Sequence, residues 1–362
     1  NYTFDLKSEY RGDPFDFFRQ IVLHHPSPYA AFIDTGSHSF CSFSPELFFY
    51  QNDNAITCKP MKGTAPRGMV AAEDNLLSSQ LFNCVKNRAE NVMIVDMIRN
   101  DLGKISRTGS VKVSELFEIE KYETIFQMTS TVEAQTDWSI PQVFKALFPC
   151  ASITGAPKIR TSQIIHELEK RPRGIYCGSI GYATPQKRAL FNVAIRTATI
   201  DYSNDSITYN VGSGVVWDSD SKNEFQECLS KAMVVQDRFS VFQLIESLLH
   251  TKDEGFFLFD SHIKRCINSC RYFGFKTDEN SLIQFLMKLK ETLPDYQVKV
   301  RCVVHKNGHI ESSITPVIST EEPVSVTIAH SPVNSTNIYL YHKTTKRQFF
   351  EEALRSSSGG QD

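Results

Sequence analysis

The sequence predicts an α+β fold arranged as two domains. Three observations support this: strand-like and helical stretches interleave over residues 1–239, the composition of the chain changes near Phe239, and a second group of strands and helices follows. The chain has 362 residues, of which 41% are hydrophobic and 22% charged, so it can bury two cores and is not typical of a disordered protein. We expect domains at residues 1–239 and 240–355, followed by a tail at residues 356–362.

The first domain contains predicted strands bounded by turn residues and helices with recognisable starts. Asp13 precedes Pro14 and is a typical N-cap residue for a helix over residues 14–25. In a second helix, over residues 85–102, only Asp96 interrupts an apolar run at residues 92–98, so we expect this helix to be buried on most sides. Further helices are predicted at residues 157–170 and 221–238, and strands at residues 4–6, 29–33, 55–58, 176–184, 190–199 and 207–211.

The second domain repeats this mixture on a smaller scale. Amphipathic spacing predicts two helices, and apolar alternation predicts four strands. The helices cover residues 262–273 and 281–293, and the strands cover residues 241–249, 297–305, 310–316 and 324–329.

The charge balance and the cysteines exclude several classes of protein. Lys and Arg total 39 against 41 Asp and Glu, giving a net charge of −2, which is not typical of a dedicated nucleic-acid or polybasic membrane-binding protein. No stretch approaches the roughly 18 apolar residues of a membrane span. The nine cysteines are scattered, without zinc-finger spacing, which favours reduced thiols. We therefore expect a cytoplasmic protein that binds neither nucleic acid nor membrane.

Three carboxylates are candidates for a metal site. Glu90 lies within the predicted helix over residues 85–102, and Glu224 and Glu227 lie three residues apart, hence on one face of a later helix. Buried carboxylates need a cation or a proton, and Mg²⁺ commonly takes one or two protein carboxylates with water and substrate oxygens. Ordinary ion pairs with Arg88, Lys86 or Lys231 are the commoner occupation of such residues, and spacing alone favours them.

Lys62, Arg196 and the Gly212-Ser213-Gly214 turn are candidates for substrate contacts. Lys62 follows a predicted strand and stands just before Gly63. If its amine is desolvated, it can act as a nucleophile; if it is solvated, Lys62 is an ordinary loop residue. Arg196 lies within a predicted apolar strand, so its guanidinium should be paired with a carboxylate. The glycine turn either offers N–H groups to an anion or is simply a hairpin.

Seven short motifs are spread along residues 1–239. They are Ser44-Pro45-Glu46, Pro60-Met61-Lys62-Gly63-Thr64, Lys86-Asn87-Arg88-Ala89-Glu90-Asn91, Arg99-Asn100-Asp101-Leu102-Gly103, Ser152-Ile153-Thr154-Gly155-Ala156-Pro157-Lys158, Ala194-Ile195-Arg196-Thr197 and Gly212-Ser213-Gly214-Val215-Val216-Trp217-Asp218-Ser219. In these motifs and their order, the chain resembles the chorismate-utilising enzymes, which implies two large antiparallel sheets forming a sandwich with helices outside. Within that family it looks most like component I of aminodeoxychorismate synthase, because anthranilate and isochorismate synthases typically carry a small residue in the slot of Lys62.

The resemblance implies a role for each site residue. Lys62 would be the nucleophile and Glu46 the general acid in the amination of chorismate to 4-amino-4-deoxychorismate, in para-aminobenzoate and folate synthesis. Mg²⁺ would be held by Glu90 and Glu227, with Glu224 alongside. The residues implied in substrate binding are Thr64, Ser152, Tyr182, Arg196, Gly212, Gly214 and Lys231.

Residues 240–355 resemble the N-terminal half of 4-amino-4-deoxychorismate lyase, a fold-type IV pyridoxal-phosphate (PLP) enzyme. The resemblance implies that Arg265, in His262-x-x-Arg265, contacts the cofactor phosphate and that Lys343 is the Schiff-base lysine. Without the resemblance, a solvated helix face for His262 and Arg265 and a surface loop for Lys343 are the favoured interpretations. Only 19 residues follow Lys343, so we expect an incomplete α/β half-domain, with PLP bound only in an intact lyase domain.

The resemblance leaves three functions to compare. The first is the aminating synthase, with ammonia supplied by a separate glutamine amidotransferase subunit. The second is an anthranilate-type or isochorismate/salicylate-type reaction on the same scaffold, which Lys62 disfavours. The third is a non-catalytic chain that serves only as a partner of the glutaminase.

Overall fold

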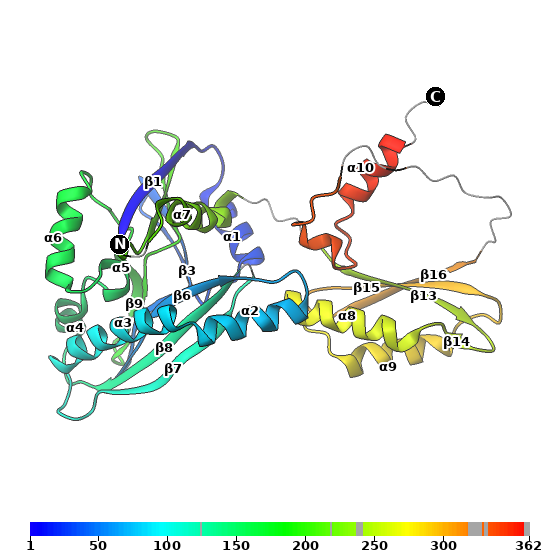
Figure 1. Ribbon diagram of the computed structural model, residues 1–362, viewed down its shortest axis with the longest axis horizontal. Coiled ribbons are helices and arrows are strands. Elements are labelled where there is room, and N and C mark those ends of the chain that lie inside the picture. The colour runs from blue at the N-terminus through cyan, green and yellow to red at the C-terminus, as the bar shows by residue number, and fades with distance from the viewer. Residues whose placement is uncertain (124, 218, 237–241, 318–327, 329–331, 358–362) are drawn as a thin grey trace. The chain divides into compact units, whose positions relative to one another are not determined.

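The computed structural model describes residues 1–123, 125–217, 219–236, 242–317, 328 and 332–357 (Figure 1). The chain forms two compact units: unit 1 contains residues 1–66 and 78–239, and unit 2 contains residues 67–77 and 240–362. The predicted boundary near Phe239 lies outside the described residues, as do residues 358–362 of the predicted tail and nearly all of the strand predicted at residues 324–329. The predicted domain limits stay a prediction.

Unit 1 contains an antiparallel five-stranded sheet among its described residues. Its strands lie in the order β1 (Tyr2–Glu9), β12 (Ser206–Ser213), β11 (Thr197–Asp201), β3 (His38–Ser44) and β2 (Tyr29–Asp34). Helices α1 (Pro14–His24) and α7 (Ser221–Gln236) pack against it. The Asp13 side chain accepts a hydrogen bond from the Asp16 N–H at 2.7 Å, which confirms the predicted N-cap of α1.

A seven-stranded sheet of unit 1 carries the predicted site residues Lys62, Thr64 and Tyr182. Its order is β6 (Met61–Pro66), β8 (Ile125–Gln135), β5 (Ala55–Lys59), β4 (Leu47–Asn52), β10 (Arg188–Val193) and β9 (Ser179–Ala183), and β7 (Lys112–Lys121) pairs with β8. Helix α3 (Val85–Gly103) packs on β6 and β8, as Figure 1 shows. The other helices are α2 (Ala71–Asn83), which begins in unit 2, α4 (Ile140–Leu147), α5 (Ala151–Thr154) and α6 (Lys158–Leu168).

Two local predictions were wrong. Helix α3 is buried on one face only: Ile94 and Ile98 are buried, but Val92 is 37% exposed and Met93 39% exposed, because the sheet covers a single side. The strand predicted at residues 190–199 is two strands, β10 and β11, which belong to different sheets. A continuous apolar run does not reveal where a chain changes sheets.

Unit 2 has a smaller antiparallel sheet among its described residues. The strand order is β14 (Gly255–Phe256), β13 (Leu244–Thr251), β15 (Val298–Val304) and β16 (Ile310–Pro316). Helix α8 (Phe259–Phe273) packs on β13, and α9 (Glu279–Lys290) packs on α8. A short 3₁₀ helix, η1 (Ile338–Leu340), and α10 (Gln348–Ser357) complete the described elements.

The predicted α+β class, with two large antiparallel sheets in the first part of the chain, is confirmed. The assignment of unit 2 to fold-type IV stays a prediction. All nine cysteines are free thiols. Among the described residues, no helix is long and apolar enough to cross a bilayer.

Candidate active site

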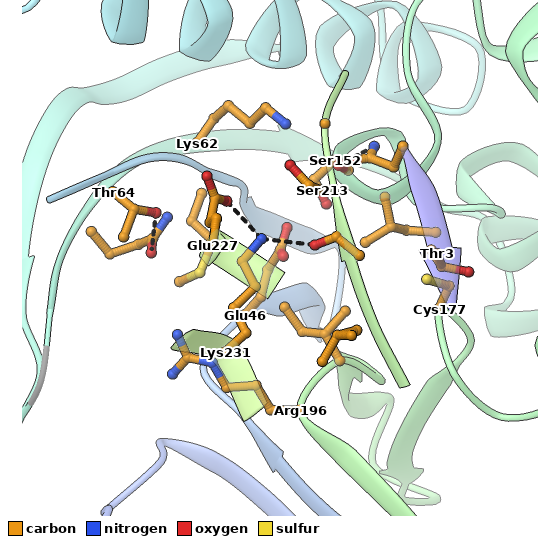
Figure 2. Close-up of a pocket in the computed structure, with 18 of the residues that line it drawn as sticks. Thr3, Glu46, Lys62, Thr64, Ser152, Cys177, Arg196, Ser213, Glu227 and Lys231 are labelled. Carbon is orange, nitrogen blue, oxygen red and sulfur yellow. Dashed lines mark hydrogen bonds and ion pairs between the residues drawn. The ribbon is translucent and has the colours of Figure 1, made fainter. Parts of the chain in front are cut away.

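A cavity of about 220 Å³ in unit 1 collects nearly all the predicted site residues of that unit (Figure 2). Those that line it are Glu46, Lys62, Thr64, Glu90, Ser152, Arg196, Gly212, Gly214, Glu224, Glu227 and Lys231. Tyr182 is the exception: it lies on β9, its side chain is 58% exposed, and it does not line this cavity. The structure therefore does not support Tyr182 as a substrate contact.

Lys62 lies in a local irregularity of β6. The pairing register of β6 with β8 shifts between Met61 and Thr64, as it does at a β-bulge, which redirects a side chain. Gly63 has a φ of 101°, and a Cβ there would lie 3.1 Å from Asn87 Cβ. Glycine is required at this position both by its backbone conformation and by its close approach to α3.

The backbone of Lys62 is also held by a buried polar pair. The Asn91 side chain, on α3, donates a long hydrogen bond of 3.5 Å to the Lys62 carbonyl. Ser130 Oγ, on β8, donates to Asn91 Oδ1 at 2.6 Å, and both side chains are buried. The lysine therefore extends into the cavity from a backbone that is fixed on two sides.

Glu46 is the most buried acid of the cavity. It lies in the short link between β3 and β4, its N–H donates to Ser44 Oγ at 3.2 Å, and its side chain is only 2% exposed. No described residue hydrogen-bonds to Oε1. Burial raises the pKa of Glu46 to about 7, against the opposing effects of Ser152, Lys62 and the Met61 N–H. This carboxyl can hold a proton near neutral pH.

Arg196 faces the cavity from the link between β10 and β11, where its φ is 49°. Its carbonyl accepts from the Phe43 N–H at 2.9 Å, which fixes the link. Burial lowers the pKa of the guanidinium, and no described carboxylate forms an ion pair with it. The expected protein partner is therefore absent from the described part of the chain, and a guanidinium in this position suits an anionic ligand.

The glycine-containing segment is not a hairpin, because β12 runs through Ser213 and pairs there with β1. Helix α7 holds it from the side. Ser213 Oγ donates to Glu224, and Lys231 Nζ donates to the Gly212 carbonyl at 2.9 Å and pairs with Glu227 Oε1 at 2.7 Å (Figure 2). The segment is thus fixed by two polar links to one helix.

The three carboxylates predicted to bind Mg²⁺ line the same cavity but do not form a ready-made cage. Among the described residues, no group of three His, Cys, Asp or Glu side chains is placed to hold a metal ion. Glu227 is paired with Lys231, and Glu224 accepts hydrogen bonds from Ser213 and Ser219. One or two protein carboxylates suffice for Mg²⁺ when substrate and water complete the shell. The donor set therefore fits a metal that binds together with an anionic substrate.

Other lining residues were not predicted as site residues. Thr64 Oγ1 donates to Gln127 Oε1 at 3.1 Å, so Gln127 supports a predicted substrate contact. Tyr176 and Cys177 enter the wall through a turn in which Cys177 has a φ of 63°. Nothing in their local sequence marks them, because a non-glycine residue in this conformation has no distinctive pattern.

In unit 2, the two residues implied in PLP binding lie near one buried carboxylate. Glu246 Oε1 accepts from Arg265 Nε at 2.8 Å, and Oε2 contacts Arg265 Nη2 at 2.5 Å and His262 Nδ1 at 2.8 Å. Lys343 is half-buried; its carbonyl accepts from the Ile245 N–H at 2.8 Å. Burial lowers the pKa of Lys343 although Glu246 opposes the shift. The segment is therefore packed against β13 and is not a free surface loop.

This arrangement does not make a PLP cradle. A phosphate at Arg265 would have to compete with the two-point pair to Glu246, which is 3% exposed and needs that charge. The described residues offer an amine and a guanidinium that is already paired. We derive no reaction step through PLP.

Comparison with known proteins gives matches over unit 1. Residues 1–237 match the family model described as chorismate binding enzyme. Aminodeoxychorismate synthase of Streptomyces pristinaespiralis is 43% identical over 225 residues, which cover 61% of this chain and 31% of that protein. Anthranilate synthase component 1 of Synechocystis sp. is 40% identical over 237 residues, which cover 63% of this chain and 47% of that protein.

Solved structures give a similar result. The crystal structure of anthranilate synthase component I from Streptococcus pneumoniae matches with a TM-score of 0.60 at 34% identity, covering 65% of this chain and 52% of that chain. The present chain spans between about a third and a half of the length of the relatives named here.

Proposed function

The chain belongs to the chorismate-binding enzyme family, and we propose that it aminates chorismate to 4-amino-4-deoxychorismate in para-aminobenzoate and folate synthesis. The observation that carries the proposal is that the Lys62 amine and the buried Glu46 carboxyl line one cavity. The two groups interact, because Lys62 opposes the rise in the pKa of Glu46. A covalent amination needs a nucleophile and an acid whose pKa lies near the working pH.

In the proposed reaction, the Lys62 amine attacks C2 of chorismate and the C4 hydroxyl leaves as water with the proton of Glu46. Ammonia then adds at C4, the lysine nitrogen leaves from C2, and one ammonia proton returns to Glu46. The net change is chorismate plus ammonia to 4-amino-4-deoxychorismate plus water. The pKa of about 7 at Glu46 allows both the donation and the return near neutral pH.

Substrate carboxylates would bind the cationic and N–H donors of the cavity. Arg196 has no carboxylate partner among the described residues, and the segment from Gly212 to Gly214 presents backbone groups to the same space. Thr64 and Ser152 supply hydroxyl groups, and Lys231 supplies a further cation. These positions would fix the ring relative to Lys62.

Mg²⁺, when bound, would neutralise the substrate's ring carboxylate from Glu90 and Glu227, with Glu224 alongside. The support is that all three line the cavity. Glu90→Gln and Glu227→Gln should each lose magnesium-dependent product formation while thermal unfolding stays cooperative. Persistence of activity in a chelator would contradict the assignment.

An anthranilate-type or isochorismate/salicylate-type reaction is the second candidate. Sequence identity does not distinguish this candidate from the first, because an aminodeoxychorismate synthase and an anthranilate synthase component are about equally similar to this chain. Lys62 favours the covalent route, since its amine reaches the cavity that would hold the ring. The word component in the relatives' names supports a separate partner subunit, which we propose to be a glutamine amidotransferase that supplies ammonia.

The test is one incubation of the 362-residue chain with chorismate, Mg²⁺ and an ammonium salt, followed by mass analysis of the products. We expect 4-amino-4-deoxychorismate. Anthranilate, isochorismate or salicylate would support the second candidate. An unchanged substrate that nevertheless binds would indicate a non-catalytic partner of the glutaminase.

A further inference from the structure

The amine of Lys62 ends against the backbone of Gly214. A Cβ built at Gly214 would lie 2.6 Å from Lys62 Nζ, 3.2 Å from Asn1 Oδ1 and 3.7 Å from Lys62 Cε, whereas ordinary van der Waals contact begins at 3.4 Å, so the closest conflict is with the amine. The space that any side chain at position 214 would occupy is therefore filled by the ammonium group. Lys62 and Gly214 lie 152 residues apart in sequence, on β6 and just beyond β12.

Gly212 is a useful contrast, because it needs to be glycine for a different reason. A Cβ there would lie 2.7 Å from the Tyr2 carbonyl oxygen and 2.7 Å from Thr3 Cγ2, inside the β1–β12 ladder. Those neighbours are backbone and a buried side chain, so alanine at Gly212 would disturb the sheet. At Gly214 the nearest atom is the mobile end of a lysine, and its φ is outside the left-handed region. Alanine at Gly214 is thus compatible with the fold.

Because both backbones are fixed, the amine must move if Gly214 gains a Cβ. The segment before Gly214 is bound to α7 through Ser213 and Glu224. The backbone of Lys62 is held by Asn91 in the bulge of β6. The remaining freedom lies in side chains: Asn1 Oδ1 would shift by a few tenths of an ångström, and the Lys62 amine would retreat by most of an ångström to restore ordinary contact.

We propose that Gly214 is a positioning residue that sets where the Lys62 amine meets the substrate. This inference rests on the proposed function, since it assigns to Gly214 a part in the lysine-dependent step. A misplacement of about 1 Å at a reacting atom can cost on the order of 100-fold in rate. Gly214 therefore acts through the missing Cβ, in addition to any N–H group it offers to an anion.

The experiment compares wild type, Gly214→Ala, Lys62→Ala and the double variant, all in the full chain. Turnover with chorismate, Mg²⁺ and ammonium is measured for wild type and Gly214→Ala, and chorismate binding is measured by calorimetry for all four. We expect Gly214→Ala to lower kcat on the order of 100-fold while the Kd for chorismate changes little in either background. Unchanged kcat would overturn the proposal. A large loss of binding in both backgrounds would also overturn it, since the Cβ would then be blocking substrate.

A readout independent of the reaction separates this inference from the proposed function. The rate at which an amine reagent labels Lys62 is followed by peptide mass analysis, with Lys7, whose side chain is 68% exposed, as the internal control. Displacement of the amine into the open cavity should raise labelling of Lys62 in Gly214→Ala and leave Lys7 unchanged. If wild type makes no amino product but labelling of Lys62 still rises in Gly214→Ala, the proposed function fails, whereas the close contact between the Lys62 amine and position 214 is supported. Unchanged labelling of Lys62 in Gly214→Ala would contradict this contact.

Discussion

Lys231 Nζ lies 2.7 Å from Glu227 Oε1, one turn earlier on α7. Glu227, a proposed Mg²⁺ ligand, is therefore already ion-paired with a lysine of the same helix. The same ammonium group donates to the Gly212 carbonyl at 2.9 Å. The side chains of Lys231 and Glu227 are 34% and 46% exposed, and such partly solvated pairs contribute about 0.2 to 1 kcal/mol. Mg²⁺ bound at Glu227 would have to displace or share this partner.

Lys231→Met is therefore expected to tighten Mg²⁺ binding by up to about fivefold, the equilibrium equivalent of the pair's free energy. The measurement is a calorimetric Mg²⁺ titration with chorismate present at a saturating concentration for each variant. Lys222→Met, on an exposed position of the same helix, is the matched control and should not change affinity. Equal or weaker Mg²⁺ binding by Lys231→Met would argue that Glu227 is not a ligand.

Glu46 should make stability depend on pH in a defined direction. Its pKa is raised from 4.5 to about 7, so the folded protein binds this proton more tightly than the unfolded chain. The stabilising contribution is complete below pH 4.5 and is lost as pH rises through 7. Glu46→Gln removes the titration, so the free energy of unfolding of wild type should fall by roughly 2 kcal/mol relative to the variant between pH 5.5 and 8.5.

Urea unfolding of both proteins at the two pH values measures this difference. Glu9→Gln, at an exposed position, is the control and should show no such trend. A constant difference between wild type and Glu46→Gln would mean that Glu46 titrates normally. The same variant should lose amination, because glutamine cannot give a proton to the leaving hydroxyl.

Sequence motifs located the site better than they described its surroundings. Lys62 was a candidate from its place before a glycine, whereas the role of Glu46 came only from the family resemblance of its motif. Arg196 lines the cavity, but it lies between two strands at a positive φ instead of within one strand, and its expected carboxylate partner is not among the described residues. Tyr182 shows the converse limit, since nothing in an alternating strand tells which face meets the cavity.

The same limit applied to the helices. Apolar residues recur at helical spacing in α6, yet Ile159 is 79% exposed and Leu168 59% exposed. Periodicity reports that a helix is amphipathic and does not identify what covers it. The ion pair between Glu246 and Arg265 could not be predicted from the sequence either, because it joins a strand to a helix through residues 19 positions apart.

In unit 2, we predict that the chain does not retain pyridoxal phosphate stoichiometrically after desalting. The physical reason is that Arg265 is paired with the buried Glu246 and is not available as a phosphate ligand without breaking that pair. Absorbance of the desalted protein, compared with Lys343→Ala, measures any specific binding. Stoichiometric cofactor that depends on Lys343, together with steady pyruvate release from 4-amino-4-deoxychorismate, would contradict the prediction.

Lys62→Ala should abolish formation of 4-amino-4-deoxychorismate while chorismate still binds. The amine is the proposed nucleophile, whereas the candidates for binding the substrate carboxylates, such as Arg196, lie on other elements of the cavity wall and stay in place. Removing a covalent nucleophile stops the step that it performs, but it leaves the acid and the anion-binding groups intact. Product mass analysis and chorismate calorimetry on the same preparation measure the two effects separately.

Lys112→Ala is the matched control and should keep full activity, since the Lys112 side chain is 70% exposed on β7. Appearance of anthranilate in Lys62→Ala would support the covalent route, because the scaffold would then deliver ammonia without the lysine adduct. Turnover equal to that of wild type would remove Lys62 from the mechanism.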